Sequence, residues 1–83
     1  MMVTMFYVYV LRSRKNDRFY IGSTKNLKKR LEEHNRGRSK ATRYIRPLEL
    51  IYKERYSTRL DAAKREKFLK MGQGRAWLKE KFS

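Results

Sequence analysis

Apolar and polar residues are arranged along this chain in a pattern that predicts three strands. Two runs rich in β-branched and aromatic residues, 5–11 and 18–22, predict largely buried strands. The polar segment between them contains Asn16-Asp17, a turn signal, so these strands are expected to pair as an antiparallel hairpin. A third strand is expected over residues 48–56, and one of its faces would carry Leu50, Tyr52 and Tyr56.

Apolar residues at helical spacing follow the second strand. Leu27 and Leu31 stand four positions apart, which predicts a helix from a cap at Ser23 or Thr24 to about Asn35. Gly37 provides a stop signal just beyond that helix.

Two further helices are expected near the C-terminal end. Thr58 and Asp61 match a capping box, so a helix is predicted over residues 59–71, ended by Gly72. The segment 72–74 is interpreted as a turn. A last short helix, residues 75–82, would present Ala76, Trp77 and Leu78 to the core.

The element order is therefore β-β-α-β-α-α, which predicts an α/β fold with a small three-stranded mixed or antiparallel sheet and helices packed on it. At 83 residues the chain is expected to form one domain, residues 1–83, with a modest core.

The chain also carries a large excess of positive charge. It has 23 Lys and Arg residues but only 8 Asp and Glu residues, which gives a formal charge of +15. Such an excess destabilises a small fold by self-repulsion and suits a polyanionic partner, above all nucleic acid. Residues 36–46 hold five basic residues and no acidic one, which predicts a basic binding loop. The candidate contact residues in it are Arg36, Arg38, Lys40 and Arg43.

Composition also excludes some functions. The chain has no cysteine and one histidine, so disulfides and a structural zinc site are excluded. Residues 1–11 lack the basic region of a signal peptide and are too short to span a bilayer, so a cytoplasmic protein is expected. A membrane-surface binder is disfavoured, because the basic residues form no single amphipathic helix with a clean apolar face.

Several residues could carry chemistry. Arg30 and His34 stand four apart on the first helix, on the side of Leu27 and Leu31, which places them near the seam between helix and sheet. The alternative is a solvated arginine and a surface histidine. Tyr9 and Tyr20 lie in the paired strands and can approach one another, or they are ordinary core aromatics.

Glu66 lies on the apolar stripe of the second helix with Ala62 and Leu69, where a carboxylate requires a partner. It is either a ligand for a hard cation such as Mg²⁺, or an edge residue that reaches solvent or pairs with a nearby lysine.

Together these residues resemble the GIY-YIG nuclease family. Tyr7-Val8-Tyr9 stands in the place of the first tripeptide of that family, and Tyr20-Ile21-Gly22 is the second. The segment from Tyr20 to His34 and the helix that holds Glu66 extend the resemblance over nearly the whole chain. It is similar to the nuclease domain of the bacterial excision-repair protein that incises 3′ to a lesion, and to short single-domain bacterial members.

The resemblance implies a metal-dependent endonuclease that hydrolyses phosphodiester bonds, with DNA favoured as substrate and one Mg²⁺ or Mn²⁺ as cofactor. It implies an active site made of Tyr9, Tyr20, Arg30, His34 and Glu66. Glu66 would hold the metal, Arg30 would contact the phosphate, His34 would orient or deprotonate a tyrosine, and either tyrosine could activate water. The chain departs from the family at Tyr7, which replaces a glycine, and at Ser23, where the repair domain has a lysine. The late asparagine of several members is not found.

A nucleic-acid-binding module of the same fold, with weak or no nuclease activity, is the alternative interpretation. The sequence leaves the oligomeric state open.

Overall fold

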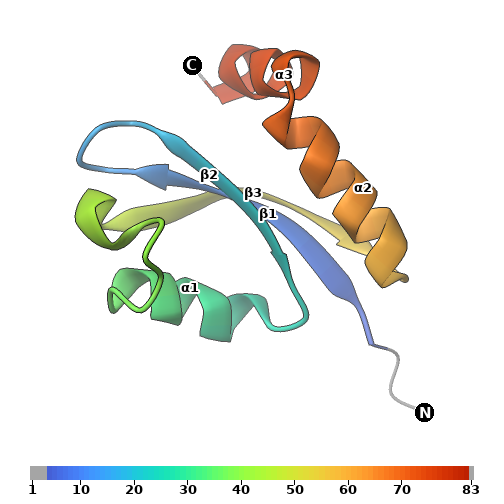
Figure 1. The fold of residues 1–83 in the computed structure, drawn as a ribbon, viewed down its shortest axis with the longest axis horizontal. Helices are drawn as coiled ribbons and strands as arrows, with labels where there is room; N and C mark the ends of the chain where they lie inside the picture. Colours follow the sequence, from blue (N-terminus) through green and yellow to red (C-terminus); the bar gives the residue numbers. More distant parts are fainter. Residues whose placement is uncertain (1–3, 83) are drawn as a thin grey trace.

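The computed structural model describes residues 4–82 and shows one antiparallel sheet between two layers of helix (Figure 1). Its three strands have the order β2-β1-β3 and are β1 (Phe6–Ser13), β2 (Phe19–Thr24) and β3 (Leu48–Tyr56). Helix α1 (Leu27–Asn35) covers one face, whereas α2 (Arg59–Lys70) and α3 (Gly72–Phe82) lie on the other. A short 3-10 turn, η1 (Arg43–Ile45), precedes β3. The predicted α/β class and element order are confirmed.

The alternation of side chains along β1 divides the core into two clusters, one on each face of the sheet. On the face of α2 and α3, Val8 and Val10 pack with Ile21 and with apolar residues of both helices. On the face of α1, Tyr9 and Leu11 pack with Leu48 and with half-buried residues of α1. The side chain of Tyr9 is therefore directed towards α1, and β1 positions it from the centre of the sheet.

A β-bulge in β3 corrects one prediction from the sequence. The register between β1 and β3 shifts after Val10, so that Val10 is opposite Tyr52 and Leu11 is opposite Leu50, which leaves one extra residue in β3. An extra residue interrupts the alternation of faces. Leu50 consequently joins the cluster under α1, while Tyr52 and Tyr56 pack on the α2 face, so these three residues do not share one face.

Helix α1 begins later than its sequence predicts. Its N-cap is Asn26, whose side chain accepts a hydrogen bond of 3.1 Å from the Lys29 amide. The predicted cap at Ser23 or Thr24 is wrong, because both residues still belong to β2. The C-terminal end at Asn35 is confirmed, and Gly37 follows it with a φ of 79°. That left-handed backbone favours glycine, and the Gly37 amide donates to the His34 carbonyl over 3.1 Å.

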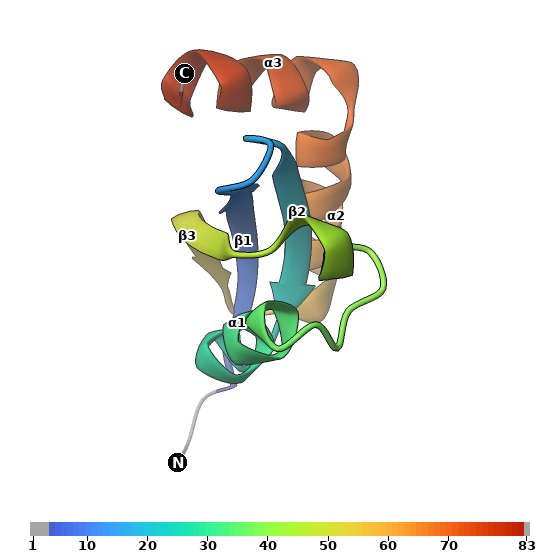
Figure 2. The ribbon, with the colours of Figure 1, turned by 90° about the vertical axis from the view of Figure 1, so that its left-hand side faces the viewer.

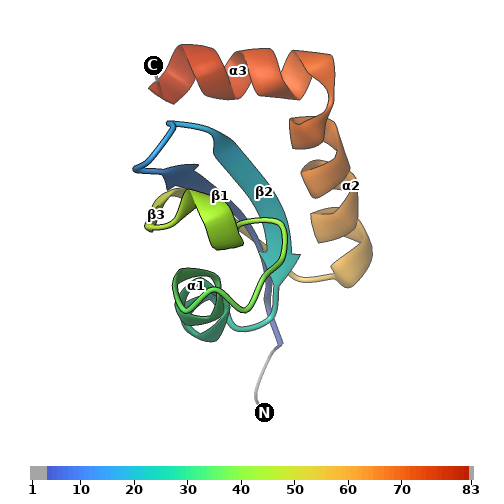
Figure 3. The ribbon, with the colours of Figure 1, turned by 60° about the vertical axis from the view of Figure 1, so that its left-hand side comes forward.

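Helices α2 and α3 meet almost without a linker. Thr58 caps α2 as predicted, accepting from the Asp61 amide, but the turn expected at residues 72–74 is already the first turn of α3. Figures 2 and 3 show α3 turned away from α2 and lying across the end of the sheet where the β1–β2 hairpin lies. Leu78 is buried and Trp77 half-buried, as expected, whereas Ala76 is exposed and does not face the core.

A charged cluster holds α2 against β3. The Glu54 carboxylate accepts two hydrogen bonds from Arg65, at 2.9 and 3.0 Å, and one each from the hydroxyls of Tyr52 and Tyr56. Burial alone would raise the pKa of Glu54, but these four donors outweigh it and hold that pKa below its ordinary value. Within residues 4–82, no helix combines the length and the apolar character that crossing a bilayer requires.

Candidate active site

Tyr9 of β1 and His34 of α1 meet inside the protein. The Tyr9 hydroxyl lies 3.1 Å from Nε2 of His34, and both residues are buried, with 2% and 0% of their surfaces exposed. His34 is therefore not the surface histidine of the alternative interpretation. The last turn of α1 brings it over the sheet because Leu27 and Leu31, on the same side of the helix, pack into the cluster around Tyr9.

Tyr20 lies close to both Tyr9 and His34. Its ring centroid lies 4.9 Å from that of His34 and 6.5 Å from that of Tyr9, so the two tyrosines and the histidine form one aromatic cluster. The sequence predicted that the tyrosines could approach one another across the hairpin, and the structure brings them together.

The glycine of the second tripeptide makes room for Tyr9. Gly22 is the register partner of Tyr9 in β2, and a Cβ at position 22 would lie 2.4 Å from the Tyr9 hydroxyl oxygen. The phenol ring thus lies directly on the Gly22 backbone and points towards the outer edge of β2. A larger residue at position 22 would displace the hydroxyl from His34.

Arg30 lies beside the Tyr9 hydroxyl, one helical turn before His34. It is half-buried, and its Nη1 is 3.5 Å from Oε1 of Glu33. Interaction with the Tyr9 hydroxyl raises the pKa of Arg30, so the guanidinium is permanently charged. Burial raises the pKa of Tyr9, and the nearby guanidinium offsets part of that increase.

His34 is held as a neutral imidazole. Burial, together with the positive charge of Arg30, lowers its pKa from 6.5 to about 4. Its second nitrogen, Nδ1, lies 2.8 Å from Oγ1 of Thr42, which is also fully buried. A neutral imidazole has one donor and one acceptor nitrogen, so the direction of the Thr42 hydrogen bond decides which nitrogen carries the proton towards Tyr9.

Thr42 is the one residue of this cluster that the sequence did not indicate. It lies in the basic segment 36–46, where a threonine gives no periodic or charge signal. Its proximity to His34 follows only from the path of the loop. Asn35 fixes that path by bonding both backbone groups of Leu48, at 2.8 and 3.0 Å.

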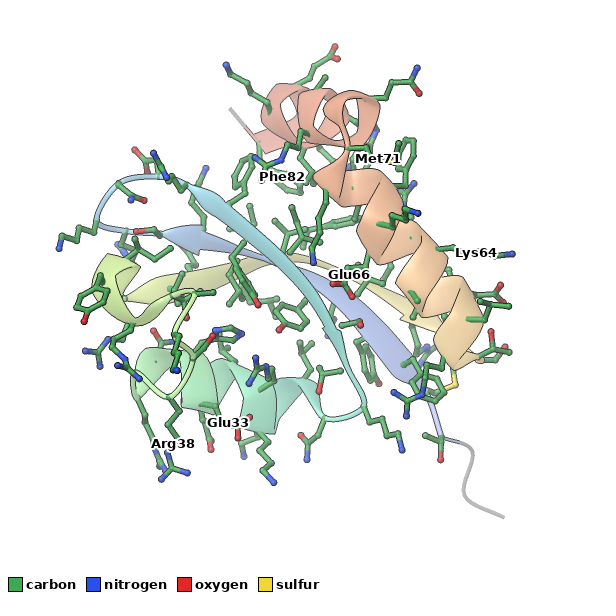
Figure 4. The ribbon with its side chains drawn as sticks, in the orientation of Figure 1. Glu33, Arg38, Lys64, Glu66, Met71 and Phe82 are labelled. Carbon is green, nitrogen blue, oxygen red and sulfur yellow. The ribbon has the colours of Figure 1, made fainter. Side chains whose placement is uncertain are left out.

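Glu66 approaches the site from the other face of the sheet, over the edge formed by β2. Its carboxylate accepts from the Ser23 hydroxyl and from the Lys70 ammonium, each over 2.6 Å, and 22% of its side chain is exposed (Figure 4). Its negative charge acts on Tyr9 and contributes to the raised pKa of that phenol. Glu66 therefore lies at the edge of the apolar stripe of α2. It pairs with Lys70, as expected for an edge residue that pairs with a nearby lysine.

The basic loop is less uniform than its sequence suggests. Arg36, Arg38, Lys40 and Arg43 are all exposed, but Ser39 and Thr42 between them are buried. Arg43 also donates a hydrogen bond of 3.1 Å to the Gly37 carbonyl. The loop therefore supports His34 through Thr42 as well as presenting cations to solvent.

The sites predicted from sequence are thus distributed over two adjoining patches. Tyr9, Tyr20, Arg30 and His34 form one cluster under α1, and Glu66 with Ser23 lies at the β2 edge beside it. Among residues 4–82, no group of three His, Cys, Asp or Glu side chains lies close enough to hold a metal ion by itself. The arrangement offers a buried phenol with a fixed imidazole, a guanidinium and one accessible carboxylate, which are the elements of general base and electrostatic catalysis.

Fold and site together define a small basic α/β domain with a buried tyrosine–histidine pair beside a guanidinium. A family model described as the GIY-YIG catalytic domain matches residues 5–79. The chain is also 38% identical over 61 residues to the UPF0213 protein of Staphylococcus saprophyticus, an alignment that covers 72% of this chain and 73% of that protein. It is 39% identical over 61 residues to UPF0213 proteins of Staphylococcus aureus, with the same coverage.

The chain therefore belongs to the GIY-YIG family, and its relatives are short members named UPF0213. This is a nuclease family whose domains act on nucleic acid.

Proposed function

We propose that this protein is a metal-dependent endonuclease that hydrolyses phosphodiester bonds in nucleic acid, with DNA as the favoured substrate. The observation that carries the proposal is the hydrogen-bonded series Tyr9–His34–Thr42 beside the Arg30 guanidinium, with the Glu66 carboxylate at the adjoining edge. Both nitrogens of the fully buried His34 face hydroxyl groups, which holds the ring in one orientation towards Tyr9.

Glu66 suits a cation that keeps most of its water. Mg²⁺ and Mn²⁺ prefer oxygen ligands, and Mg²⁺ is commonly bound by one or two carboxylates together with substrate phosphates. One partly exposed carboxylate and the Ser23 hydroxyl beside it are compatible with that mode, although they could not hold a dehydrated ion. When bound, such a cation would neutralise charge on the phosphate and on the leaving oxygen.

Tyr9 is the residue that we assign to water activation. With the proton of His34 on Nε2, the Thr42 hydroxyl donates to Nδ1 and Nε2 donates to the Tyr9 oxygen. The Arg30 charge acts on the same oxygen. These two groups favour the phenolate against the burial that opposes it, and the phenolate, once its proton has left to solvent, takes a proton from the attacking water.

His34 orients Tyr9 in this mechanism and does not store its proton. An imidazole with a pKa of about 4 is a weak proton acceptor near neutral pH. Arg30, with its fork of donors, would stabilise the charge that develops on the phosphate. Tyr20 then forms a wall of the site.

Substitution of Glu66 tests the metal-dependent activity. Glu66→Gln should abolish cleavage of a DNA substrate in Mg²⁺ or Mn²⁺ and should remove Mn²⁺ binding measured by electron paramagnetic resonance. It loses a partly exposed ion pair to Lys70, so its unfolding free energy in EDTA should change by at most about 1 kcal/mol. Glu32→Gln, at an exposed position of α1, is the matched control and should cut normally.

Conservative replacement by phenylalanine distinguishes the roles of the two tyrosines. Tyr9→Phe should reduce the single-turnover cleavage rate by at least roughly a hundredfold, the scale of general base catalysis. Tyr20→Phe should lose much less, because its assigned contribution is the ring. The reverse order of effects would contradict the role given to Tyr9.

A binding module without nuclease activity is the second candidate, and one observation favours it. Lys70 already neutralises Glu66, and a lysine in that place competes with a cation. Lys70→Ala should strengthen Mn²⁺ binding if the site is catalytic. If neither the natural protein nor Lys70→Ala binds Mn²⁺ or cuts, the binding module is the correct interpretation.

A further inference from the structure

An exposed tyrosine stands on the η1 turn, within the basic loop. Among residues 4–82, Tyr44 is the most exposed of the large apolar and aromatic side chains, with 75% of its surface exposed. Its neighbour Ile45 is half-buried and packs in the cluster around Tyr9. The turn is therefore anchored through Ile45 and presents Tyr44 to the outside. One exposed apolar side chain is common on protein surfaces, so the surroundings of Tyr44 decide whether it has a use.

The β1–β2 hairpin holds the turn that carries Tyr44. Oγ of Ser13, a fully buried residue, donates a hydrogen bond of 2.6 Å to the Ile45 carbonyl. Nζ of Lys15 donates to the carbonyl of Tyr44 itself over 3.2 Å. Figures 1 and 2 show η1 beside the loop of this hairpin. Because its backbone is already fixed, the turn loses little conformational entropy when a ligand contacts the ring.

A hollow of about 550 Å³ next to Tyr44 is lined by cations and by no acidic side chain. Its lining consists of Lys15, Asn35, Arg43, Tyr44, Arg46 and Pro47. Each of the three cations donates to a backbone carbonyl, Lys15 to that of Tyr44, Arg43 to that of Gly37 and Arg46 to that of Arg43. A carbonyl has no net charge, so these bonds orient the cations and leave their positive charge in place.

Arg46 is the most firmly placed of these cations. Its Nε donates to the Arg43 carbonyl over 2.9 Å. Its guanidinium also lies against Gly37, where an added Cβ would be 2.8 Å from Nη1. A guanidinium that is already held in place loses less entropy when it pairs with a phosphate. The hollow therefore offers an oriented phosphate-binding group beside an exposed aromatic ring.

The η1 turn adjoins the candidate active site. Its N-cap residue is Thr42, whose Oγ1 lies 2.8 Å from Nδ1 of His34, and Nε2 of His34 lies 3.1 Å from the Tyr9 hydroxyl. Tyr44 follows Thr42 by two residues, so their Cα atoms are separated by at most about 7 Å. A strand of nucleic acid that reaches Tyr9 is therefore within reach of the Tyr44 ring.

A fixed aromatic ring with cations beside it fits an unpaired nucleotide. Stacking of bases on aromatic side chains, combined with Lys and Arg contacts to the backbone, is how proteins bind single strands. In a continuous duplex the bases are stacked on one another, and their faces cannot receive the ring. A small anion would use the cations and leave the ring without a contact.

We propose that Tyr44 stacks on an unpaired base of the substrate, and that Lys15, Arg43 and Arg46 bind the phosphates beside that base. The assignment rests on the proposed function for nucleic acid as the ligand. It adds the class of substrate, which is a nucleic acid with a single-stranded segment next to the bond that is cut. Tyr44 is then a residue that determines specificity and takes no part in the chemical step.

The test compares three DNA ligands in EDTA, where no cleavage occurs: an unstructured single strand, a forked duplex and a blunt duplex. Tyr44→Ala should weaken binding to the first two by roughly tenfold, the scale of one stacked base, and should leave the blunt duplex unchanged. Tyr44→Phe keeps the ring and should bind like the natural protein. Leu60→Ala removes another exposed apolar side chain, 64% exposed on α2 across the sheet, and should change none of the three affinities.

The dependence of binding on salt separates the ring from the charges. Tyr44→Ala removes no charge, so the slope of log K against log salt for the single strand should stay the same. Arg46→Gln should reduce that slope by about 0.7, which corresponds to one lost phosphate contact. The melting temperature of Arg46→Gln shows whether the loop remains folded, and the Tyr44 variants alone decide the matter if it does not.

Several outcomes would overturn the assignment. They are an equal loss on all three ligands, no loss in Tyr44→Ala, a Tyr44→Phe variant as weak as Tyr44→Ala, and a dimer of the natural protein that Tyr44→Ala dissociates. The last result would assign the ring to self-association. A protein that never cuts but shows the selective loss refutes the proposed nuclease activity and keeps the assignment of Tyr44. A protein that cuts, and whose affinities do not respond to Tyr44→Ala, refutes the assignment of Tyr44 alone.

Discussion

Single residues of the site show how burial sets their chemistry. Arg30 and His34 follow one another on α1 at helical spacing, yet one remains charged and half-exposed while the other is buried and neutral. Both stand on the side of α1 that Leu27 and Leu31 pack onto the sheet, but His34 is enclosed between Tyr9 and Thr42, whereas Arg30 stays partly exposed beside Glu33. The same burial that removes the charge of His34 also allows it to hold the Tyr9 hydroxyl in one place.

The lowered pKa of His34 predicts a loss of stability in mild acid. An unfolded histidine takes up a proton near pH 6.5, whereas the folded one resists it down to about 4. Falling pH therefore stabilises the unfolded state, and the unfolding free energy should drop by about 2 kcal/mol between pH 7 and pH 5. Urea denaturation at the two pH values measures the drop.

His34→Gln provides the control for that measurement. His34 is the only histidine of the chain, so the variant has no imidazole to titrate in this range. Carboxylates such as Glu54, whose pKa is below its ordinary value, lose their contribution only at still lower pH. A variant that loses as much stability as the natural protein between pH 7 and 5 would show that His34 is not the cause.

At the scale of elements, the junction between α2 and α3 depends on one close approach. A Cβ on Gly74 would lie 2.1 Å from the Phe68 carbonyl oxygen and 2.6 Å from Cα of Leu69, both backbone atoms of α2. Because neither atom can yield like a flexible side chain, α3 can cross the end of α2 only with glycine at position 74. This crossing also brings Arg75 and Phe82 to the hairpin.

Gly74→Ala should therefore destabilise the fold by about 3 kcal/mol, the upper range of overpacking effects. Gly72→Ala is a matched control two positions away in α3, where a Cβ would meet nothing within 4 Å. It should be neutral or stabilise the fold by up to about 1 kcal/mol, because alanine is the better helix former. Urea unfolding measures the change in unfolding free energy of both variants, and equal changes would contradict the packing argument.

For the whole molecule, the dominant property is the formal charge of +15. Cations are presented by the exposed basic loop next to α1, and Arg12, Arg18 and Arg75 lie between the β1–β2 hairpin and α3. An extended polyanion that passes the β2 edge could contact both regions. A compact ligand could not, and the spread of the charge therefore favours a nucleic acid over a small acidic molecule.

Binding to duplex DNA should depend steeply on salt. Four phosphate contacts correspond to a loss of roughly a hundredfold in affinity between 50 and 200 mM salt. Neutralising Arg36, Arg38 and Lys40 together should reduce that dependence and leave the melting temperature unchanged. Arg43 is left in place because it bonds to the Gly37 carbonyl and thus supports the loop. An affinity that hardly responds to salt would show that the charge has another use.

The sequence by itself determined the class of fold, the order of its elements and four members of the aromatic and basic cluster. Each of these depends on local periodicity: alternation in the strands, four-residue spacing on α1, and turn residues at Asn16-Asp17, where Asp17 adopts a φ of 61°. Because side chains at such spacing share a face whatever lies opposite them, Arg30 and His34 could be placed near the seam between helix and sheet, and Tyr9 near Tyr20. Only the resemblance to the family joined these two pairs into one site.

Only the tertiary structure decided what depends on distant segments. The contact of Thr42 with His34 requires the path of a loop, and the shift of Leu50 to the α1 face requires a bulge that is defined by pairing with β1. The position of Glu66 depends on how far α2 overhangs the edge of β2, where Lys70 and Ser23 reach it. These features arise from packing between elements, and the periodicity of a single element contains no information about the neighbour it will meet.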